Sequence, residues 1–303
     1  MKYYAGLDIG GTTGRIRISD MSGSLIGEFQ CGGCSIHEGA EERAKRKYRE
    51  LVTPVLLQNG LVPEECEKIC VAASGVDSEN LREQCKRCFV EMGFEESKVV
   101  VFNDCEIFLQ FYEKPSLILV AGTGSISFGM NKNGNVCRTG GWGHILSDEG
   151  SGFDIGMQVI KAVGNHLDRR KKEDILYQLF YDRTRISDLE SLNNFVNQNV
   201  MTKTAVAGLA PLAGAAAERG SETAEEIQQE TAEKLFRLVW DNYNKMGTNP
   251  QEMLTVILWG GVILKNTAVK ELVVKKIEET IPNVRIAVPE KPAVEIALKA
   301  AMS

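Results

Sequence analysis

Two stretches of this chain repeat the same order of predicted elements, one near the start and one after Pro115. Residues Tyr3–Asp8 form a short apolar run that ends in a carboxylate, and a glycine-rich turn leads to a second run at Arg15–Ser19. Residues Ser116–Ala121 form a similar run, and another glycine-rich turn leads to Ile126–Met130. Short apolar runs bounded by glycine turns are typical of strands. The repeat therefore predicts two lobes of related topology.

Each predicted lobe continues with both helices and strands, which indicates the α/β class. After a third strand at 25–31, the first lobe is predicted to contain a helix at 41–58, a strand at 68–73, a helix at 79–92 and a strand at 98–102. The second is predicted to contain helices between 153 and 246 and strands at 253–258 and 284–288, and a last helix follows it at 293–301. We expect the first lobe to span residues 1–114 and the second to span 115–291, with a cleft between them.

The composition is that of an ordinary globular protein without a nucleic-acid or membrane partner. A chain of 303 residues exceeds the usual size of a single hydrophobic core, which agrees with two lobes. The formal net charge of −6 does not suit binding to nucleic acid or to an anionic membrane. No apolar run is long enough to span a bilayer, and Asp8 follows the start too closely for a signal peptide. We therefore expect the protein in the cytoplasm.

The eight cysteines include two Cys-x-x-Cys pairs, Cys31/Cys34 and Cys85/Cys88. Four thiols would suffice for a zinc or iron–sulfur site. The second pair lies in a predicted helix, where this spacing arises easily, and reduced cysteine is the default for a chain without an export signal. We expect reduced thiols, with a metal cluster as the alternative.

Both predicted strand pairs are joined by a turn rich in glycine and hydroxyl side chains. Backbone N–H groups in such turns can surround a phosphate, and threonine and serine hydroxyls add donors. Hairpin turns use the same residue types, but two turns at equivalent positions could hold one polyphosphate from both sides. Neither turn has the spacing of the dinucleotide-binding or Walker motifs. The residues expected to bind the nucleotide phosphates are Gly10, Gly11, Thr12, Thr13, Gly122, Thr123, Gly124 and Ser125.

Polar residues stand at three strand ends of the first lobe. Asp8 could hold Mg²⁺ directly or through water, since this ion takes few carboxylates; the alternative is a cap at the strand end. Asp104, beside Asn103, could orient a sugar hydroxyl and accept its proton during phosphoryl transfer. The alternative for Asp104 is the N-cap of a helix at 105–111. Ser74 could add a contact to the sugar.

The segment Gly140–Gly152 combines several glycines with Trp142 and an acid pair. Glycine lets a ligand approach the backbone, tryptophan offers a flat apolar face, and Asp148 supplies acceptors for hydroxyl groups. This combination suits a sugar; the alternative is a hairpin before a helix capped by Ser151.

A glycine pair, Gly260 and Gly261, follows the predicted strand at 253–258. A backbone without side chains offers a surface on which a flat adenine ring can lie. The alternative is tight packing between this strand and the helix that follows, and one glycine pair can serve both purposes.

The chain resembles the N-acetylglucosamine kinase group of the BadF/BadG/BcrA/BcrD ATPase family, within the actin–Hsp70–sugar kinase superfamily. The most specific matching motif runs from Gly140–His144 through Asp148–Ser151. The looser motifs are Asp8–Thr12, Ala73–Gly75, Asn103–Asp104, Gly122–Ser125, Gly260–Gly261 and Pro292–Val294. They follow the family's order and span nearly the whole chain.

This resemblance implies two lobes of ribonuclease H-like, actin-like ATPase topology that bind ATP between them. It implies Mg²⁺ near Asp8 and Asp104 as the general base on the sugar 6-hydroxyl. It also implies a homodimer, closure of the lobes on the substrate, and a terminal helix at 292–303 that packs on the first lobe. The residues implied in amino-sugar binding are Ser74, Asn103, Gly141, Trp142 and Asp148.

Two positions depart from the family's pattern. The loop Gly32–Gly39 contains no asparagine, although family members usually hold the sugar with one there. His37 or Glu38 could replace it, so N-acetylmuramic acid and glucosamine are alternatives to N-acetylglucosamine. Ser147 stands where the family commonly has glycine.

Two other functions would suit this fold. An activator ATPase of the 2-hydroxyacyl-CoA dehydratase or benzoyl-CoA reductase type would drive electron transfer through an iron–sulfur cluster, and the cysteines leave it open. The loop around Trp142 would have no role there, so we prefer the kinase. A sugar-sensing regulator without catalysis is the remaining alternative.

Overall fold

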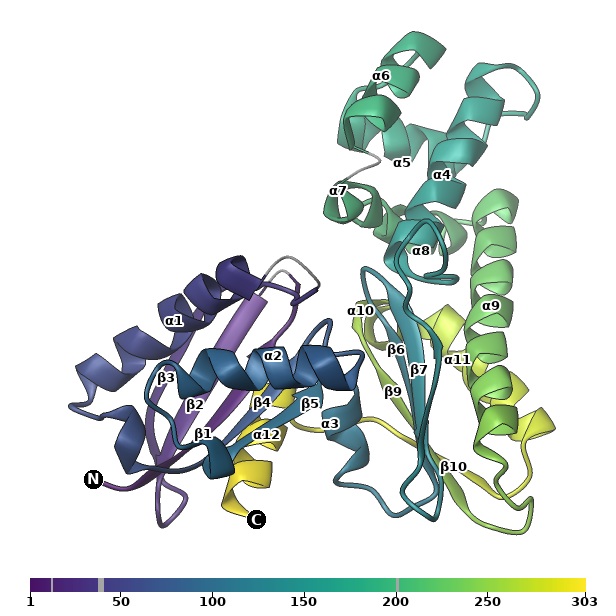
Figure 1. Ribbon diagram of the computed structural model, residues 1–303. Coiled ribbons are helices and arrows are strands. Elements are labelled where there is room, and N and C mark those ends of the chain that lie inside the picture. The colour runs from purple at the N-terminus through teal and green to yellow at the C-terminus, as the bar shows by residue number, and fades with distance from the viewer. Residues whose placement is uncertain (12, 38–40, 200–201) are drawn as a thin grey trace. The chain divides into compact units, whose positions relative to one another are not determined.

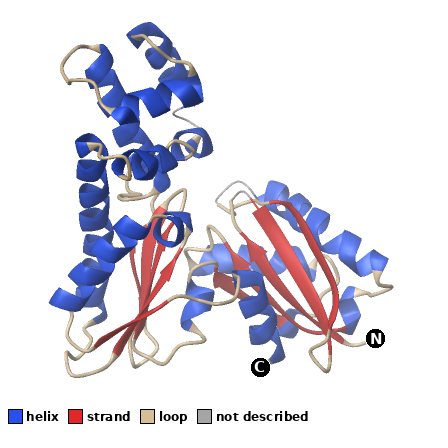
Figure 2. Ribbon diagram, turned by 180° about the vertical axis from the view of Figure 1, so that it is seen from behind, coloured by secondary structure: helices blue, strands red, loops and turns tan. Residues whose placement is uncertain are grey.

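The computed structural model describes residues 1–11, 13–37, 41–199 and 202–303, and the chain divides into two compact units (Figure 1). The first unit comprises Met1–Tyr112 and Glu290–Ser303, and the second comprises Glu113–Pro289. Each unit contains a five-stranded sheet with helices packed on it (Figure 2). The expected α/β class is confirmed.

The first sheet has the strand order β3-β2-β1-β4-β5. Its strands are β1 (Tyr3–Ile9), β2 (Thr13–Asp20), β3 (Leu25–Gly32), β4 (Cys66–Ala73) and β5 (Val99–Asn103). The first three form an antiparallel meander, whereas β1, β4 and β5 run parallel. The carboxyl ends of the parallel strands therefore lie along one edge, where α/β sheets commonly bind ligands.

Helices cover both faces of this sheet. The helices are α1 (Glu41–Gln58), α2 (Glu79–Val90), α3 (Glu106–Leu109) and α12 (Ala293–Met302), and 3-10 turns lie at Pro63–Glu65 and Glu96–Lys98. Successive side chains of a strand point to opposite faces, and Leu7 of β1 shares a core with Tyr48 of α1. Gly6 points the other way, toward α12, where a side chain would lie 2.1 Å from the backbone nitrogen of Leu298. The close packing of α12 on β1 therefore requires a glycine here.

The second sheet, of order β10-β9-β6-β7-β8, repeats the topology of the first. Its strands are β6 (Ser116–Ala121), β7 (Ser125–Met130), β8 (Val136–Gly140), β9 (Leu254–Trp259) and β10 (Val284–Ala287). Again the first three strands form an antiparallel meander, and β6, β9 and β10 are parallel. The repeat seen in the sequence is thus a repeat of topology.

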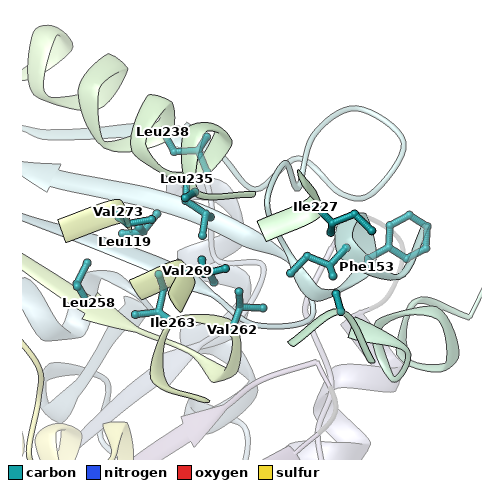
Figure 3. Packing of buried hydrophobic residues seen from close by; sticks show 14 of the residues in the cluster. Leu119, Phe153, Ile227, Leu235, Leu238, Leu258, Val262, Ile263, Val269 and Val273 are labelled. Carbon is teal, nitrogen blue, oxygen red and sulfur yellow. The ribbon is translucent and has the colours of Figure 1, made fainter. Parts of the chain in front are cut away.

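Helices of the second unit enclose its core and extend beyond the sheet (Figure 1). They are α4 (Gly152–Leu167), α5 (Ile175–Thr184), α6 (Leu189–Asn199), α7 (Lys203–Ala207), α8 (Ala210–Ala217), α9 (Glu222–Met246), α10 (Gly261–Lys265) and α11 (Thr267–Thr280). Leu119 and Leu258 of the sheet pack in one cluster with Leu235 of α9 and Val273 of α11 (Figure 3). No helix in the described ranges is long and apolar enough to cross a membrane.

Candidate functional site

Polar side chains collect at the carboxyl edge of the first sheet. Asp8 lies near the end of β1, Ser74 follows β4, and Asn103 and Asp104 stand at the end of β5. The parallel register brings these strand ends together, since Asp8 pairs with Ala72 of β4 and Ala73 pairs with Asn103. Residues that are far apart in the sequence therefore share one end of the first unit.

The turn between β1 and β2 closes with a hydrogen bond from the Gly10 amide to the Thr13 carbonyl, at 2.9 Å. A side chain at Gly11 would lie 3.1 Å from the hydroxyl oxygen of Ser35. That hydroxyl donates to the Ser74 hydroxyl at 3.1 Å. Ser35 thus connects the glycine turn to Ser74. Thr12, predicted to contact phosphate, lies outside the described residues.

Ser35 was not identified by the sequence motifs. It belongs to the loop Gly32–Gly39, for which the sequence analysis noted only the missing asparagine. A single serine in such a loop carries no specific signal of function. The loop is held to the end of β4 by a hydrogen bond from the Ile36 amide to the Ser74 carbonyl, at 3.1 Å. Glu38, one of the two proposed replacements for the asparagine, lies outside the described residues, and His37 is exposed.

The carboxyl group of Asp104 is half-buried beside other acids. Burial, together with the negative charges of Asp8 and Asp77, raises the pKa of Asp104 to about 7. A carboxyl group with a pKa near the working pH is well matched to general-base catalysis.

The start of α3 is held by Asn103. Its side-chain oxygen accepts from the Cys105 amide at 2.9 Å, and its side-chain nitrogen donates to Asp77 at 3.0 Å. The N-cap position of α3 belongs to Cys105, and no side chain caps the helix there. The alternative in which Asp104 is the N-cap of this helix is therefore wrong. A sugar contact by Asn103 stays a prediction.

Asp8 is a largely buried acid beside a base on the neighbouring strand. Burial raises its pKa, and the guanidinium of Arg15, 3.6 Å from the carboxylate, partly offsets this shift. Within the described ranges no three His, Cys, Asp or Glu residues form a metal-binding group. The Asp8 carboxylate beside the glycine turn still fits Mg²⁺, which commonly takes one or two carboxylates and completes its shell with phosphate and water.

The equivalent turn in the second unit joins β6 to β7. The Gly122 amide donates to the Gly124 carbonyl at 2.9 Å, and the Gly152 amide at the start of α4 donates to the Gly122 carbonyl at 2.7 Å. The Ser125 hydroxyl donates to the Glu149 carbonyl at 2.6 Å. The turn is thereby joined to the loop before α4, whose N-cap is Ser151.

Asp148 lies directly against this turn. Its side chain is only 3% exposed, and one carboxylate oxygen accepts from the Ser125 amide at 3.2 Å. The other oxygen pairs with the ammonium group of Lys203 at 2.5 Å. One oxygen thus accepts a hydrogen bond, and among the described residues the other has an ionic partner but no hydrogen bond. A contact of Asp148 with a sugar stays a prediction, and Lys203 was not found from the sequence.

The indole ring of Trp142 is 61% exposed. The guanidinium of Arg138 lies 3.9 Å from its centroid and donates to the carbonyl of Gly141 at 2.7 Å. Cation–π contact and this hydrogen bond hold the ring on the glycine segment. The exposed area leaves apolar surface available to a ligand.

A cavity of about 980 Å³ lies within the second unit. It is lined by Gly122, Thr123, Gly152, Ile155, Thr204, Ala207, Gly208, Ala210, Pro211, Gly214, Ala215, Ala217, Glu218, Glu225, Gln228, Gly261, Val262, Lys265, Asn266, Thr267 and Ala268. The glycine turn between β6 and β7 thus forms part of its wall. Its size is at the upper end of the range for small-molecule sites.

Gly260 and Gly261 differ in their surroundings. Gly260 has φ of +102°, and a side chain there would lie 2.4 Å from the carbonyl oxygen of Ala121. Tight strand–helix packing therefore requires Gly260, as the alternative interpretation stated. Gly261 lines the cavity, and the contact of this glycine pair with adenine stays a prediction.

All eight cysteines are free thiols. Burial raises the pKa of Cys70 and of Cys85 to about 12, which keeps both protonated. The described residues contain no metal-binding group, and Cys88 donates to the Gln84 carbonyl inside its own helix. These thiols pack as small buried side chains.

Two units of the same sheet topology, each with a glycine turn after its first strand, define an α/β protein of the two-lobed actin-like ATPase class. Residues 5–303 match the BadF/BadG/BcrA/BcrD ATPase family, and the chain belongs to this family.

Two relatives of this chain bear the names of amino-sugar kinases. It is 34% identical over 238 residues to the N-acetylmuramic acid/N-acetylglucosamine kinase of Clostridium acetobutylicum, a match that covers 78% of both chains. It is 27% identical over 294 residues to the N-acetyl-D-glucosamine kinase of Dictyostelium discoideum, covering 93% of this chain and 92% of that one. A solved structure described as a candidate N-acetylglucosamine kinase, from Chromobacterium violaceum, has a TM-score of 0.78 at 23% identity over 100% of this chain and 99% of its own, which shows a shared fold.

Proposed function

We propose that this protein is an ATP-dependent kinase that phosphorylates the 6-hydroxyl group of an amino sugar, with N-acetylglucosamine or N-acetylmuramic acid as the first candidates. The observation that carries this proposal is Asp104, an acid of pKa about 7 at the strand edge that also holds Asp8 and the first glycine turn. The names of the Clostridium and Dictyostelium relatives support the sugar class.

In this mechanism Asp104 accepts the proton of the sugar hydroxyl as the hydroxyl oxygen attacks the γ-phosphorus of ATP, and the bond from that phosphorus to the β-phosphate oxygen breaks so that ADP leaves. Ser74, Gly141 and Trp142 orient the sugar. The two glycine turns bind the phosphates through backbone N–H groups. Asp8 would hold Mg²⁺, and the bound ion would neutralise charge on the phosphates.

The rival functions are not favoured. An activator ATPase holds an iron–sulfur cluster on cysteine ligands from two subunits, whereas the relatives bear sugar kinase names. Iron in anaerobically purified protein would support the activator. A non-catalytic regulator would bind sugar without ATP turnover.

A coupled assay of ADP release tests the proposal. The sugars are glucosamine, N-acetylglucosamine, N-acetylmuramic acid, N-acetylmannosamine and glucose, with product analysis to locate the new phosphate. We expect turnover to be fastest with an N-acetylated glucosamine. Equal, slow ADP release with and without every sugar would refute the kinase assignment.

Three finer features belong to the same proposal. We expect domain limits near 1–114 and 115–291, with closure of the lobes on the sugar. We also expect a homodimer and a cytoplasmic location. Light scattering of the purified protein tests the dimer, and limited proteolysis with and without sugar and nucleotide tests the closure.

A further inference from the structure

A buried thiol lies against the carboxyl group of Asp104. The Sγ atom of Cys105 donates to Oδ1 of Asp104 at 3.6 Å, and the Cys105 side chain is buried. Cys34 and Cys88, by contrast, donate to backbone carbonyls, at 3.6 Å and 3.3 Å. The contact of Cys105 differs from theirs because its acceptor is the side chain that is proposed to take the proton of the sugar.

The backbone of Cys105 is fixed on the side of β5. Its amide donates to the side-chain oxygen of Asn103 at 2.9 Å, and the side-chain nitrogen of Asn103 donates to Asp77 at 3.0 Å. Asn103 is itself buried. These bonds leave the main chain that carries the thiol little freedom, so the thiol is presented to Asp104 from a fixed point.

Helix α3, which begins directly after Cys105, is anchored as well. All four of its residues, Glu106–Leu109, are buried. The Glu106 carboxylate accepts from the guanidinium of Arg82 on α2 at 3.0 Å and from the Asn103 amide at 3.4 Å. This carboxylate therefore joins β5, α2 and α3 at one corner of the first unit, and Cys105 stands at that corner.

The acids around Asp104 supply negative charge rather than hydrogen-bond donors. Burial and the charge of Asp8, at the end of β1, raise the pKa of Asp104, and Asp77, in the loop after β4, acts in the same direction. The hydrogen bond from Cys105 opposes this rise. An ionised carboxylate is an acceptor only, so Asp8 and Asp77 in that form cannot hold the Asp104 carboxylate in one orientation, whereas a thiol donor can.

We propose that Cys105 is a positioning residue for Asp104: its thiol holds Oδ1, so that Oδ2 faces the hydroxyl group of the sugar. The inference rests on the proposed kinase function. In the transfer step the hydroxyl proton moves to Oδ2, the hydroxyl oxygen forms its bond to the γ-phosphorus, and the bond from that phosphorus to the β-phosphate oxygen breaks. The thiol keeps its own proton throughout. Because it orients the base, it should affect kcat rather than the binding of either substrate.

Cys105→Ala and Cys105→Ser test this role by initial rates. Alanine removes the donor and should lower kcat about two- to tenfold, the effect of one net hydrogen bond, with an unchanged KM for the sugar and for ATP. Serine keeps a donor at this position, so its kcat should lie nearer to that of the wild type. A native kcat in Cys105→Ala, or equal losses in the two variants, would overturn the inference.

Cys88→Ala is the matched control. It removes another buried thiol of the first unit, one that donates to the Gln84 carbonyl inside α2. This change should leave kcat unchanged even if it lowers the Tm. A loss of kcat equal to that of Cys105→Ala would show that buried thiols act only through the packing of the unit, against the inference.

The S–H stretching band in the infrared spectrum tests the contact without any turnover of sugar. The difference between wild type and Cys105→Ser at neutral pH isolates the band of this thiol. Donation to a carboxylate weakens the S–H bond, so the band should lie at lower wavenumber than in an Asp104→Ala background. A band that does not move when Asp104 is removed would refute the contact and the inference with it. If the band moves but no sugar is phosphorylated, the thiol contact stands and the kinase function is what fails.

Discussion

The ammonium group of Lys203 lies 2.5 Å from the carboxylate of Asp148, whose other oxygen accepts from the Ser125 amide at 3.2 Å. If the turn between β6 and β7 binds phosphate, as proposed, a buried carboxylate against it would repel the nucleotide unless its charge were compensated. The lysine, from the first turn of α7, supplies that compensation.

Removal of this ammonium group should weaken both stability and nucleotide binding. Lys203→Met leaves the Asp148 carboxylate, which is 3% exposed, without its ionic partner. We expect a loss of about 1–3 kcal/mol in the free energy of unfolding, measured by urea denaturation, and a raised KM for ATP.

The second variant Lys203→Met/Asp148→Asn should recover part of the lost stability, because no buried charge is left unpaired. Lys275→Met is the control, since Lys275 pairs with Glu279 at 3.9 Å on an exposed helix face and such pairs contribute little. Equal effects of the two lysine variants would argue against the role given to Lys203.

Asp104→Asn should abolish phosphoryl transfer while leaving nucleotide binding intact. A general base contributes typically about 10²–10⁴-fold to the rate, so kcat in the coupled assay should fall by that factor, with ADP affinity by calorimetry unchanged. Asp182→Asn, on α5 of the other unit, is the control. Native turnover in Asp104→Asn would show that another group accepts the proton.

The activity of the wild-type protein should rise with pH through about 7. Burial and the charges of Asp8 and Asp77 raise the pKa of Asp104 to that value, and only the ionised form can accept a proton. A plot of log kcat/KM against pH should therefore rise and level off above neutrality. A profile that is flat from pH 5 to 8 would disagree with Asp104 as the base.

The same pKa predicts an effect on stability. In the unfolded chain an aspartate titrates near about 3.9, so the folded state binds the proton more tightly and loses stability as the pH rises from there to about 7. Asp104→Asn has no such loss. Its Tm should exceed that of the wild type at pH 8 by more than it does at pH 5.

Trp142→Ala should impair sugar binding without affecting the fold. The ring is 61% exposed and is held on one face by Arg138, so its removal should change the free energy of unfolding by less than about 0.5 kcal/mol. We expect a higher KM for the sugar and an unchanged KM for ATP, both from initial rates. A rise in the KM for ATP alone would place the ring near the nucleotide instead.

Much of the fold could be predicted because its signals are local. The strand, glycine turn and strand of each half are adjacent in sequence, and their apolar runs and turn residues indicate them directly. The helix predicted at 105–111 is shorter in the structure, where α3 spans Glu106–Leu109. Asn103 rather than Asp104 accepts the hydrogen bond from the Cys105 amide just before this helix.

The sequence by itself determined the two related sheets, the position of both glycine turns and the acids at the strand ends, because each depends on residues next to one another in the chain. Only the tertiary structure joined Ser35 to Ser74, Lys203 to Asp148, and Arg82 to Glu106. These pairs come from separate elements, and their side chains carry no pattern that indicates the partner. Such contacts depend on how helices pack on the sheets, which periodicity and turn chemistry do not specify.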